Sequence, residues 1–326
     1  MPKTSTDTLI RLDGPTMGTR WSVLLDEPSV DADLQPRLQA VVDQVDAQMS
    51  TWKPDSDLMR LNAAPLDAWV TLPDDLLTVL SAGLAISRQT DGAFEMNIGN
   101  AVRAWGFGPD GISLDAIKAA SAERRVPATD ALELDLANKL ARKSAALSLD
   151  LSGIAKGYGV DRLAETAQQL GHGATLCTID GEVRATGHRR NGHPWSVAVE
   201  TPDAAAVARH SLLALEDMAV ATSGDYRHFV TVGRTRLSHT MDPQRGAPLV
   251  AAPASVSVLS PACMLADAMA TALMVMGEER GLAFAQDHKI SALFLHRSSN
   301  GTIPNGTGAF ATAGSVAEVR EAGWVP

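Results

Sequence analysis

The stretch Asp150-Leu-Ser-Gly-Ile-Ala-Lys-Gly-Tyr158 joins two different periodicities. It connects a predicted strand over residues 146–151 to a predicted helix over residues 158–170, which Gly171 ends. Its glycines and Lys156 lie at a helix start, where backbone N–H groups can hold an anion. The order of Gly and Lys differs from that of a Walker A loop. An ordinary turn explains the stretch equally well, so its ligand stays open.

Strand and helix patterns continue on both sides of this junction. Residues 19–25 alternate as a strand does, whereas residues 34–49, 74–89 and 114–125 have helical spacing. Further strands are predicted at 174–179, 183–186, 195–200, 218–222, 229–232, 254–259 and 291–295, and helices at 264–276 and 278–286. No repeat, low-complexity segment or linker interrupts them, which predicts one α+β domain.

The composition excludes several classes of protein. The 326 residues are 45% hydrophobic and carry a formal net charge of -10, which argues against a nucleic-acid partner. The two cysteines, Cys177 and Cys263, are too far apart for a metal motif and too few for a disulfide scaffold, so we expect two buried thiols. No apolar run could span a bilayer, and the N-terminus does not read as a signal peptide. We expect a cytoplasmic protein, or a periplasmic one if a leader was removed.

Asp267 and Thr271 form a polar pair in an otherwise apolar segment. They lie four residues apart in the predicted helix over 264–276, so their oxygens share one face. Because their neighbours are apolar, we expect both to be buried and to need partners. A carboxylate and a hydroxyl suit a hard cation such as Mg²⁺, which usually also binds water and substrate phosphate. A solvated helix face or a local hydrogen bond would give the same spacing.

His239, Asp242 and Arg245 share one short loop before the turn at residues 246–248. A histidine beside a carboxylate and a guanidinium is suited to proton transfer next to phosphate. A histidine that only satisfies a turn is the plainer alternative.

The order of these and other segments resembles the ApbE family of FAD:protein FMN transferases. The matching segments are Met17-Gly-Thr19; Ser50-Thr-Trp52 with Ser56 and Asn62; Gly92-Ala-Phe-Glu95; Trp105-Gly-Phe-Gly108; Leu151 to Tyr158; Ser223-Gly-Asp-Tyr-Arg227; Ser238-His239 with Asp242-Pro243 and Arg245-Gln-Gly246; and Ala266-Asp-Ala268 with Thr271. The resemblance covers residues 14–315, between an N-terminal extension (1–13) and a C-terminal tail (316–326). It implies one α+β domain related to the T-fold class, with mixed or antiparallel sheets and packed helices.

The resemblance also implies roles for individual residues. Mg²⁺, or Mn²⁺, would be held by Asp267, Thr271 and the backbone carbonyl of Ala155. His239 matches the catalytic histidine, with Asp242 beside it and with Lys156 or Arg245 as candidates to stabilise the leaving phosphate. FAD would contact Met17, Trp52, Ala93, Phe94, Glu95, Ser152, Tyr158 and Met241.

The implied reaction splits FAD and attaches FMN, through a phosphoester, to a Thr or Ser of an acceptor flavoprotein, with release of AMP. The acceptor segment would be of the Asp-Gly-x-Thr-x-Thr type. Two other functions would use the same FAD-binding and metal-binding residues. An FAD pyrophosphatase would use water in place of the protein hydroxyl, and a flavin-binding protein would hold FAD without turnover.

Three positions depart from the family pattern. Asp180-Gly-Glu182 stands where Gly-Gly-Glu is usual, Glu95 where Asp is usual, and Met96-Asn97 where Pro-Thr is common. Glu95 keeps the charge. Asp180 adds a side chain where we expect the backbone to approach a ligand closely, so we expect it to weaken acceptor or flavin binding.

Overall fold

An eight-stranded antiparallel sheet forms the centre of the protein. The computed structural model describes residues 9–109, 111–202, 209–225, 229–232, 235–250, 252–298, 301–311 and 317–319. Within these residues the strand order is β1 (Ile10–Thr16), β2 (Thr19–Leu25), β6 (Thr175–Ile179), β7 (Glu182–Thr186), β10 (Ala219–Gly224), β15 (Ser255–Ser260), β16 (Ser291–Ser298) and β17 (Gly301–Gly306). β1 begins at Ile10, so this sheet already includes residues of the segment assigned to the N-terminal extension.

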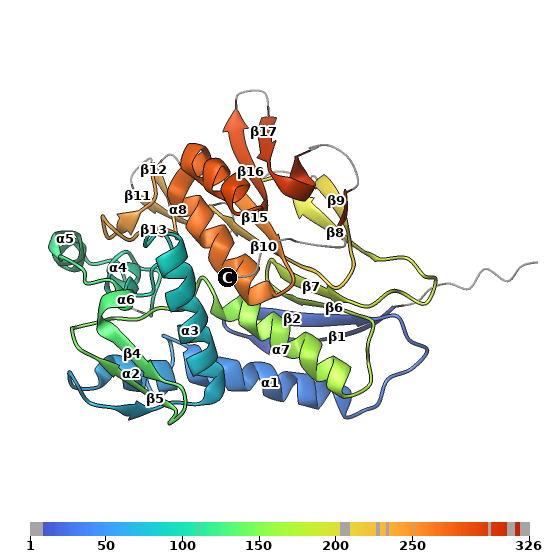
Figure 1. The fold of residues 1–326 in the computed structure, drawn as a ribbon, viewed down its shortest axis with the longest axis horizontal. Coiled ribbons are helices and arrows are strands. Elements are labelled where there is room, and N and C mark those ends of the chain that lie inside the picture. The colour runs from blue at the N-terminus through green and yellow to red at the C-terminus, as the bar shows by residue number, and fades with distance from the viewer. Residues whose placement is uncertain are drawn as a thin grey trace, which may run out of the picture.

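Helices cover one face of this sheet. Figure 1 shows α1 (Leu34–Met49), α7 (Ala155–Gln169) and α8 (Cys263–Asp287) on that side, with α3 (Asp74–Gln89) beside α8. α8 packs on β10 and β15, whereas α7 packs on β6 and β7 and also contacts α1 and α8. α7 and α8 are therefore neighbours above the middle of the sheet.

A second, smaller sheet covers the other face. Its strand order is β18 (Ala317–Val319), β9 (Arg209–Leu215) and β8 (Trp195–Glu200). Side chains of the central strands alternate between the two sides: Phe294 of β16 belongs to the core under the helices, and Leu293 and Leu295 belong to the core shared with Trp195 of β8. The result is a three-layer arrangement that confirms the predicted α+β class.

The remaining elements lie mainly beside the helical layer. They are α2 (Asp57–Ala63), β3 (Val70–Thr71), α4 (Gly99–Ala104), α5 (Leu114–Ala122), α6 (Ala128–Ala131), β4 (Leu132–Asp135), β5 (Leu140–Lys143), β11 (Phe229–Val232), β12 (Thr235–Ser238), β13 (Met241–Asp242), β14 (Ala247–Pro248) and a 3₁₀ turn at Gly308–Phe310. In Figure 1, α2, β4 and β5 lie beyond α3, away from the large sheet. None of the described helices is both long and apolar enough to cross a lipid bilayer.

The central sheet separates between β7 and β10. These strands pair only through Arg184 with Ala219 and Val183 with Val220. Farther along, β10 is paired with β15 alone among the described strands. The separation leaves an opening in the sheet, near the start of α7 and the first turns of α8.

The predicted strand over residues 146–151 is wrong. These residues form no strand, and their N–H groups bond to side chains and a loop instead of a neighbouring strand. The N–H of Leu149 donates to Asn62 Oδ1 (2.8 Å), that of Ser148 to Asn97 Oδ1 (2.7 Å), and that of Asp150 to the carbonyl of Met96 (2.8 Å). Because these partners satisfy the backbone, the segment keeps the apolar alternation of a strand without a ladder.

Several predicted boundaries also shift. The helix predicted from residue 158 begins at Ala155, and the one predicted to reach residue 125 ends at Ala122. The two predicted helices over 264–276 and 278–286 are both parts of α8, which Gly277 interrupts with a φ of 75°. Both cysteines are buried thiols, as expected.

Candidate functional site

A cavity of about 850 Å³ opens where the central sheet separates. Separate stretches from both halves of the sequence supply its wall. They include residues 17–19, 45–53 (without 47 and 48), 93–95, 150–156 (without 154), 180–183, 197–200, 220–224 (without 221), 239–243 (without 242), and Ile98, Val102, Phe107, Asp267, Thr271 and Val275. The cavity is large enough to enclose most of a dinucleotide-sized ligand.

Gly157 allows α7 and α8 to approach closely at the floor of this cavity. A Cβ at this position would lie 2.5 Å from the carbonyl oxygen of Cys263 and 2.8 Å from Cβ of Asp267. With no side chain there, the N–H of Gly157 reaches Asp267 Oδ2 at 3.0 Å. Ala155, two residues before Gly157, also lines the cavity.

Thr271 lies one turn along α8 from Asp267. Its hydroxyl is 3.1 Å from that of Ser223 on β10. Gly153 leaves this hydroxyl accessible, since a Cβ there would lie 3.0 Å from Thr271 Oγ1. Asp267, Thr271 and Ala155 therefore face one space, although α7 and α8 are far apart in the sequence.

Lys156 lies between carboxylates on the wall of the cavity. Its Nζ is 3.0 Å from both oxygens of Glu182 and 3.4 Å from Asp180 Oδ2. Burial pulls the pKa of Lys156 down, but Glu182, Asp267 and Asp180 outweigh it and raise that pKa above its ordinary range. Lys156 is a fixed positive charge at this position.

Asp267 is buried in the same network. Burial raises the pKa of its carboxyl above the usual range, and the neighbouring Glu182 raises it further. The charge of Lys156 and the N–H of Gly157 act in the opposite direction. A cation beside Asp267 would therefore favour its charged form.

The first turn of α8 is held by Asp161 of α7, a residue that sequence reasoning missed. Its carboxylate accepts from the N–H groups of Cys263 and Met264 at 2.9 Å each and lies 2.6 Å from Arg184 Nη1. The residue before α8, Ala262, has no side chain that could cap the helix. The sequence offers only an indirect signal for this contact. The helix that begins at Cys263 has no local capping residue, and the predicted helix over 158–170 contains an Asp.

Most of the residues predicted to contact FAD line the cavity. Met17 lies in the turn between β1 and β2 with a φ of 45°, in the left-handed region that few side chains adopt. Trp52 is 62% exposed at the edge, and Phe94 is buried. Ala93, Ser152 and Met241 also line the wall.

Glu95 lines the cavity, but its carboxylate is occupied by backbone groups. It accepts from the N–H of Asn97 (2.7 Å) and of Ala128 (3.1 Å). Burial raises the pKa of Glu95, and these N–H groups partly offset the rise. Its carboxylate therefore organises the loop behind this part of the wall.

His239 follows β12 directly and lines the cavity. Its ring lies 6.4 Å from that of Phe107, edge to face. Pro243 and Met241 line the wall next to it.

Three predicted site residues do not line the cavity. The carboxylate of Asp242 accepts from the N–H groups of Gln244 (2.9 Å) and Arg245 (3.1 Å), which shapes the loop after His239. Arg245 itself is not on the wall. The hydroxyl of Tyr158 donates to Asp75 Oδ1 at 2.5 Å, behind the cavity. Tyr226 and Arg227 of the family-like segment lie outside the described residues.

The predicted metal ligands offer hard oxygen donors. Within the described residues, no group of three or more His, Cys, Asp or Glu side chains is arranged to hold a metal ion. The predicted trio contains one carboxylate, one hydroxyl and one backbone carbonyl, and Asp267 Oδ1 makes no hydrogen bond to the described residues. This donor set fits Mg²⁺, which completes its coordination with water and substrate phosphate.

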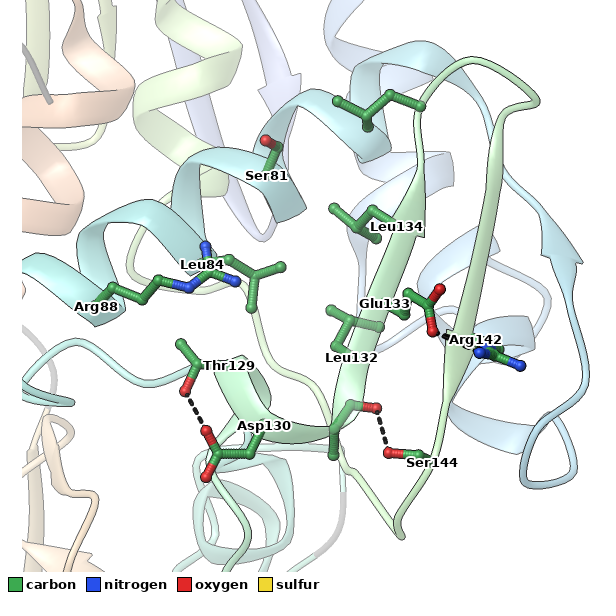
Figure 2. Close-up of a pocket in the computed structure, with 12 residues that line it drawn as sticks. Ser81, Leu84, Arg88, Thr129, Asp130, Leu132, Glu133, Leu134, Arg142 and Ser144 are labelled. Atoms are coloured by element: carbon green, nitrogen blue, oxygen red, sulfur yellow. Dashed lines mark hydrogen bonds and ion pairs between the residues drawn. The ribbon is translucent and has the colours of Figure 1, made fainter.

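A second cavity, of about 500 Å³, lies between α3 and the β4–β5 hairpin (Figure 2). Two pairs of its polar side chains bond to each other: Arg142 Nε donates to Glu133 at 2.8 Å, and Thr129 donates to Asp130 at 3.2 Å. None of the predicted site residues lines it.

Comparisons with known proteins agree with this geometry. The sequence model of the ApbE family matches residues 17–294. An FAD:protein FMN transferase from Vibrio cholerae is 36% identical over 299 residues, which are 90% of this chain and 89% of that protein. One from Haemophilus influenzae is 34% identical over 313 residues, 93% of this chain and 90% of that protein.

Solved structures give the same result. The flavin transferase ApbE from Vibrio cholerae superposes with a TM-score of 0.82 at 33% identity, covering 94% of this chain and 99% of that one. The apo flavinyl transferase ApbE from Pseudomonas stutzeri gives 0.81 at 36% identity, covering 93% and 96%. In fold, the chain is of the α+β class that these flavin transferases represent. It belongs to the ApbE family.

Proposed function

We propose that this chain is a Mg²⁺-dependent FAD:protein FMN transferase, which attaches FMN to a Thr or Ser of an acceptor flavoprotein and releases AMP. The observation that carries the proposal is the single cavity that brings together Asp267, Thr271 and Ala155, the charge of Lys156, and His239. Relatives at 36% and 34% identity are FAD:protein FMN transferases.

The wall near α1 suits the flavin half of FAD. Phe94 and Met17 offer apolar surface inside the cavity, and the exposed ring of Trp52 can stack on a flat ring at the edge. Ser152 lies next to the start of α7, where backbone N–H groups can bind phosphate oxygens.

The space between α7 and α8 suits the pyrophosphate. Asp267, Thr271 and the carbonyl of Ala155 would hold Mg²⁺, which would neutralise negative charge on the phosphates. Lys156 contributes a positive charge on the same side, held in place by Glu182. Its position suits stabilisation of the phosphate that leaves with AMP.

His239 is placed to accept a proton. In the proposed step, the acceptor hydroxyl oxygen bonds to the FMN phosphorus, the bond from that phosphorus to the AMP oxygen breaks, and His239 takes the hydroxyl proton. Atoms balance, since FAD and a protein hydroxyl give FMN–protein, AMP and one proton. An acceptor segment of the Asp-Gly-x-Thr-x-Thr type would supply the hydroxyl.

A product balance tests the proposal. The protein is incubated with FAD, Mg²⁺ and a flavoprotein domain that carries such a segment, and AMP, free FMN and protein-bound flavin are quantified by chromatography. We expect equal amounts of AMP and bound flavin, with little free FMN. Equal AMP and free FMN would instead identify a pyrophosphatase, and intact FAD would identify a binding protein.

A further inference from the structure

Four consecutive residues of β8, Val197 to Glu200, line the reaction cavity. Successive side chains of a strand point to opposite faces, so one face can present only every second residue. Val197, Ala198 and Val199 precede the register shift between Val199 and Glu200, so a wall that contains all three is formed by the edge of the strand. The edge of β8, with its backbone groups, borders the cavity.

This edge has no neighbouring strand among the described residues. β8 pairs with β9 on its other side, and the sheet order ends at β8. In an antiparallel pair, every second residue directs its N–H and C=O away from the partner strand. Therefore either Val197 and Val199, or Ala198 between them, direct a backbone N–H and C=O toward the cavity. Such an edge is a template for pairing with another chain.

Residues with proposed roles in binding FAD or metal lie elsewhere on the wall. They come from the β1–β2 turn, the loop after α1, the loop after α3, the segment before α7, the first residue of α7, β13 and α8. The edge of β10 also contributes consecutive residues, Thr222 to Gly224, but the hydroxyl of Ser223 is bonded to Thr271 and so belongs to the metal side. None of the residues with proposed roles in binding FAD or the metal lies on β8.

We propose that an extended segment of the acceptor protein binds the edge of β8 as a fourth strand of the β18–β9–β8 sheet. This inference rests on the proposed function, because it names how the acceptor hydroxyl enters the cavity that contains His239. Main-chain hydrogen bonds supply the affinity in this mode of recognition, and alternate side chains supply the specificity. An added strand presents every second side chain to the cavity, which is the spacing of the two Thr in the Asp-Gly-x-Thr-x-Thr segment.

A pair of proline variants tests this mode of binding. Val197→Pro and Ala198→Pro each remove one N–H, but neighbouring N–H groups point to opposite sides of the strand. The variant that loses the outward N–H should raise the acceptor KM about 10-fold, with the KM for FAD unchanged. The variant that loses the inward N–H should lower the melting temperature, since it breaks pairing with β9. Two folded variants with an unchanged acceptor KM would overturn the proposal.

If neither variant folds, hydrogen exchange of the wild-type enzyme tests whether the acceptor binds the edge of β8. The probe is the acceptor domain with its acceptor Thr replaced by Ala, which cannot be modified and so forms a lasting complex. Amides within residues 197–199 should exchange at least about 10-fold more slowly with this probe, and FAD alone should not protect them. Unchanged exchange at saturating probe would overturn the proposal. If the wild-type enzyme does not modify the unaltered acceptor at all, the proposed function fails first.

Discussion

Lys156 is the residue on which the charge balance of the site depends. Its Nζ contacts both oxygens of Glu182, and its charge also acts on Asp267. Both carboxylates are buried. Lys156→Met would leave these carboxylates without a nearby cation. We expect a loss of about 3 kcal/mol of unfolding free energy, measured by urea denaturation.

The double variant Lys156→Met with Glu182→Gln separates charge balance from packing. Because Glu182→Gln removes one of the carboxylates left unpaired, the double variant should lose clearly less stability than the two single losses combined. Lys118→Met, at a solvent-exposed lysine on α5, is the control and should have little effect. Strictly additive losses would show that Lys156 does not balance Glu182.

His239 is expected to act in proton transfer and not in FAD binding. His239→Ala should slow FMN transfer by about 10²- to 10⁴-fold, as the loss of acid–base catalysis does, and leave the Kd for FAD nearly unchanged. Stopped-flow rates and FAD fluorescence titration measure the two effects. His193→Ala, at an exposed loop outside the cavity, is the matched control. Transfer at the wild-type rate would assign the proton to another group.

At the scale of single residues, the sequence predicted which residue types gather in the site but not what each side chain contacts. The order of short motifs led to Asp267, Thr271 and His239, all of which line the cavity. It could not reveal that Tyr158 bonds to Asp75, or that Asp161 caps α8, because both contacts join residues through packing of helices that the sequence does not place. Asp180 lines the cavity with a φ of 57°, a conformation that Gly would adopt more easily.

At the scale of elements, the contact between α7 and α8 sets the spacing of the proposed metal ligands. Gly157→Ala would place a Cβ against the backbone of Cys263 and force the helices apart. We expect a loss of about 2 kcal/mol in stability and a higher Mg²⁺ concentration for half-maximal transfer. The measurements are thermal unfolding and a Mg²⁺ titration of activity.

The control for Gly157→Ala is Gly173→Ala. Gly173 has a backbone conformation open to other residues, and a Cβ there would meet nothing within 4 Å. It should leave both quantities nearly unchanged. If Gly157→Ala gave the wild-type Mg²⁺ requirement in a stable protein, the helix spacing would not control the metal site.

Periodicity predicted most of the long elements. Helices α1 and α3 have the predicted bounds, because their apolar spacing is regular over 16 residues each. The wrongly predicted strand at 146–151 shows where periodicity fails. The side chains of Asn62 and Asn97 accept from its backbone N–H groups, and no local sequence pattern distinguishes such bonds from pairing with a strand. Strands β1 and β17 were not predicted, because both contain Gly and Pro, which are more typical of turns and are tolerated in strands mainly at a sheet edge.

At the scale of the whole molecule, the separation of β7 from β10 creates the cavity. Parts of the wall that are remote in sequence, such as Met17, Lys156 and Asp267, meet there because α7 and α8 pack side by side over the opened sheet. The class of fold could be predicted from intermixed strand and helix patterns and from the family resemblance. The separation itself could not, because it depends on where strand pairing stops.

The most direct test of the account is the intact mass of an acceptor domain after incubation with this protein, FAD and Mg²⁺. We predict an added mass of one FMN, which disappears when EDTA replaces Mg²⁺, when the acceptor Thr is changed to Ala, or when the enzyme carries Asp267→Asn. An unmodified acceptor beside free FMN and AMP, or an adduct that persists in EDTA and with Asp267→Asn, would contradict the account.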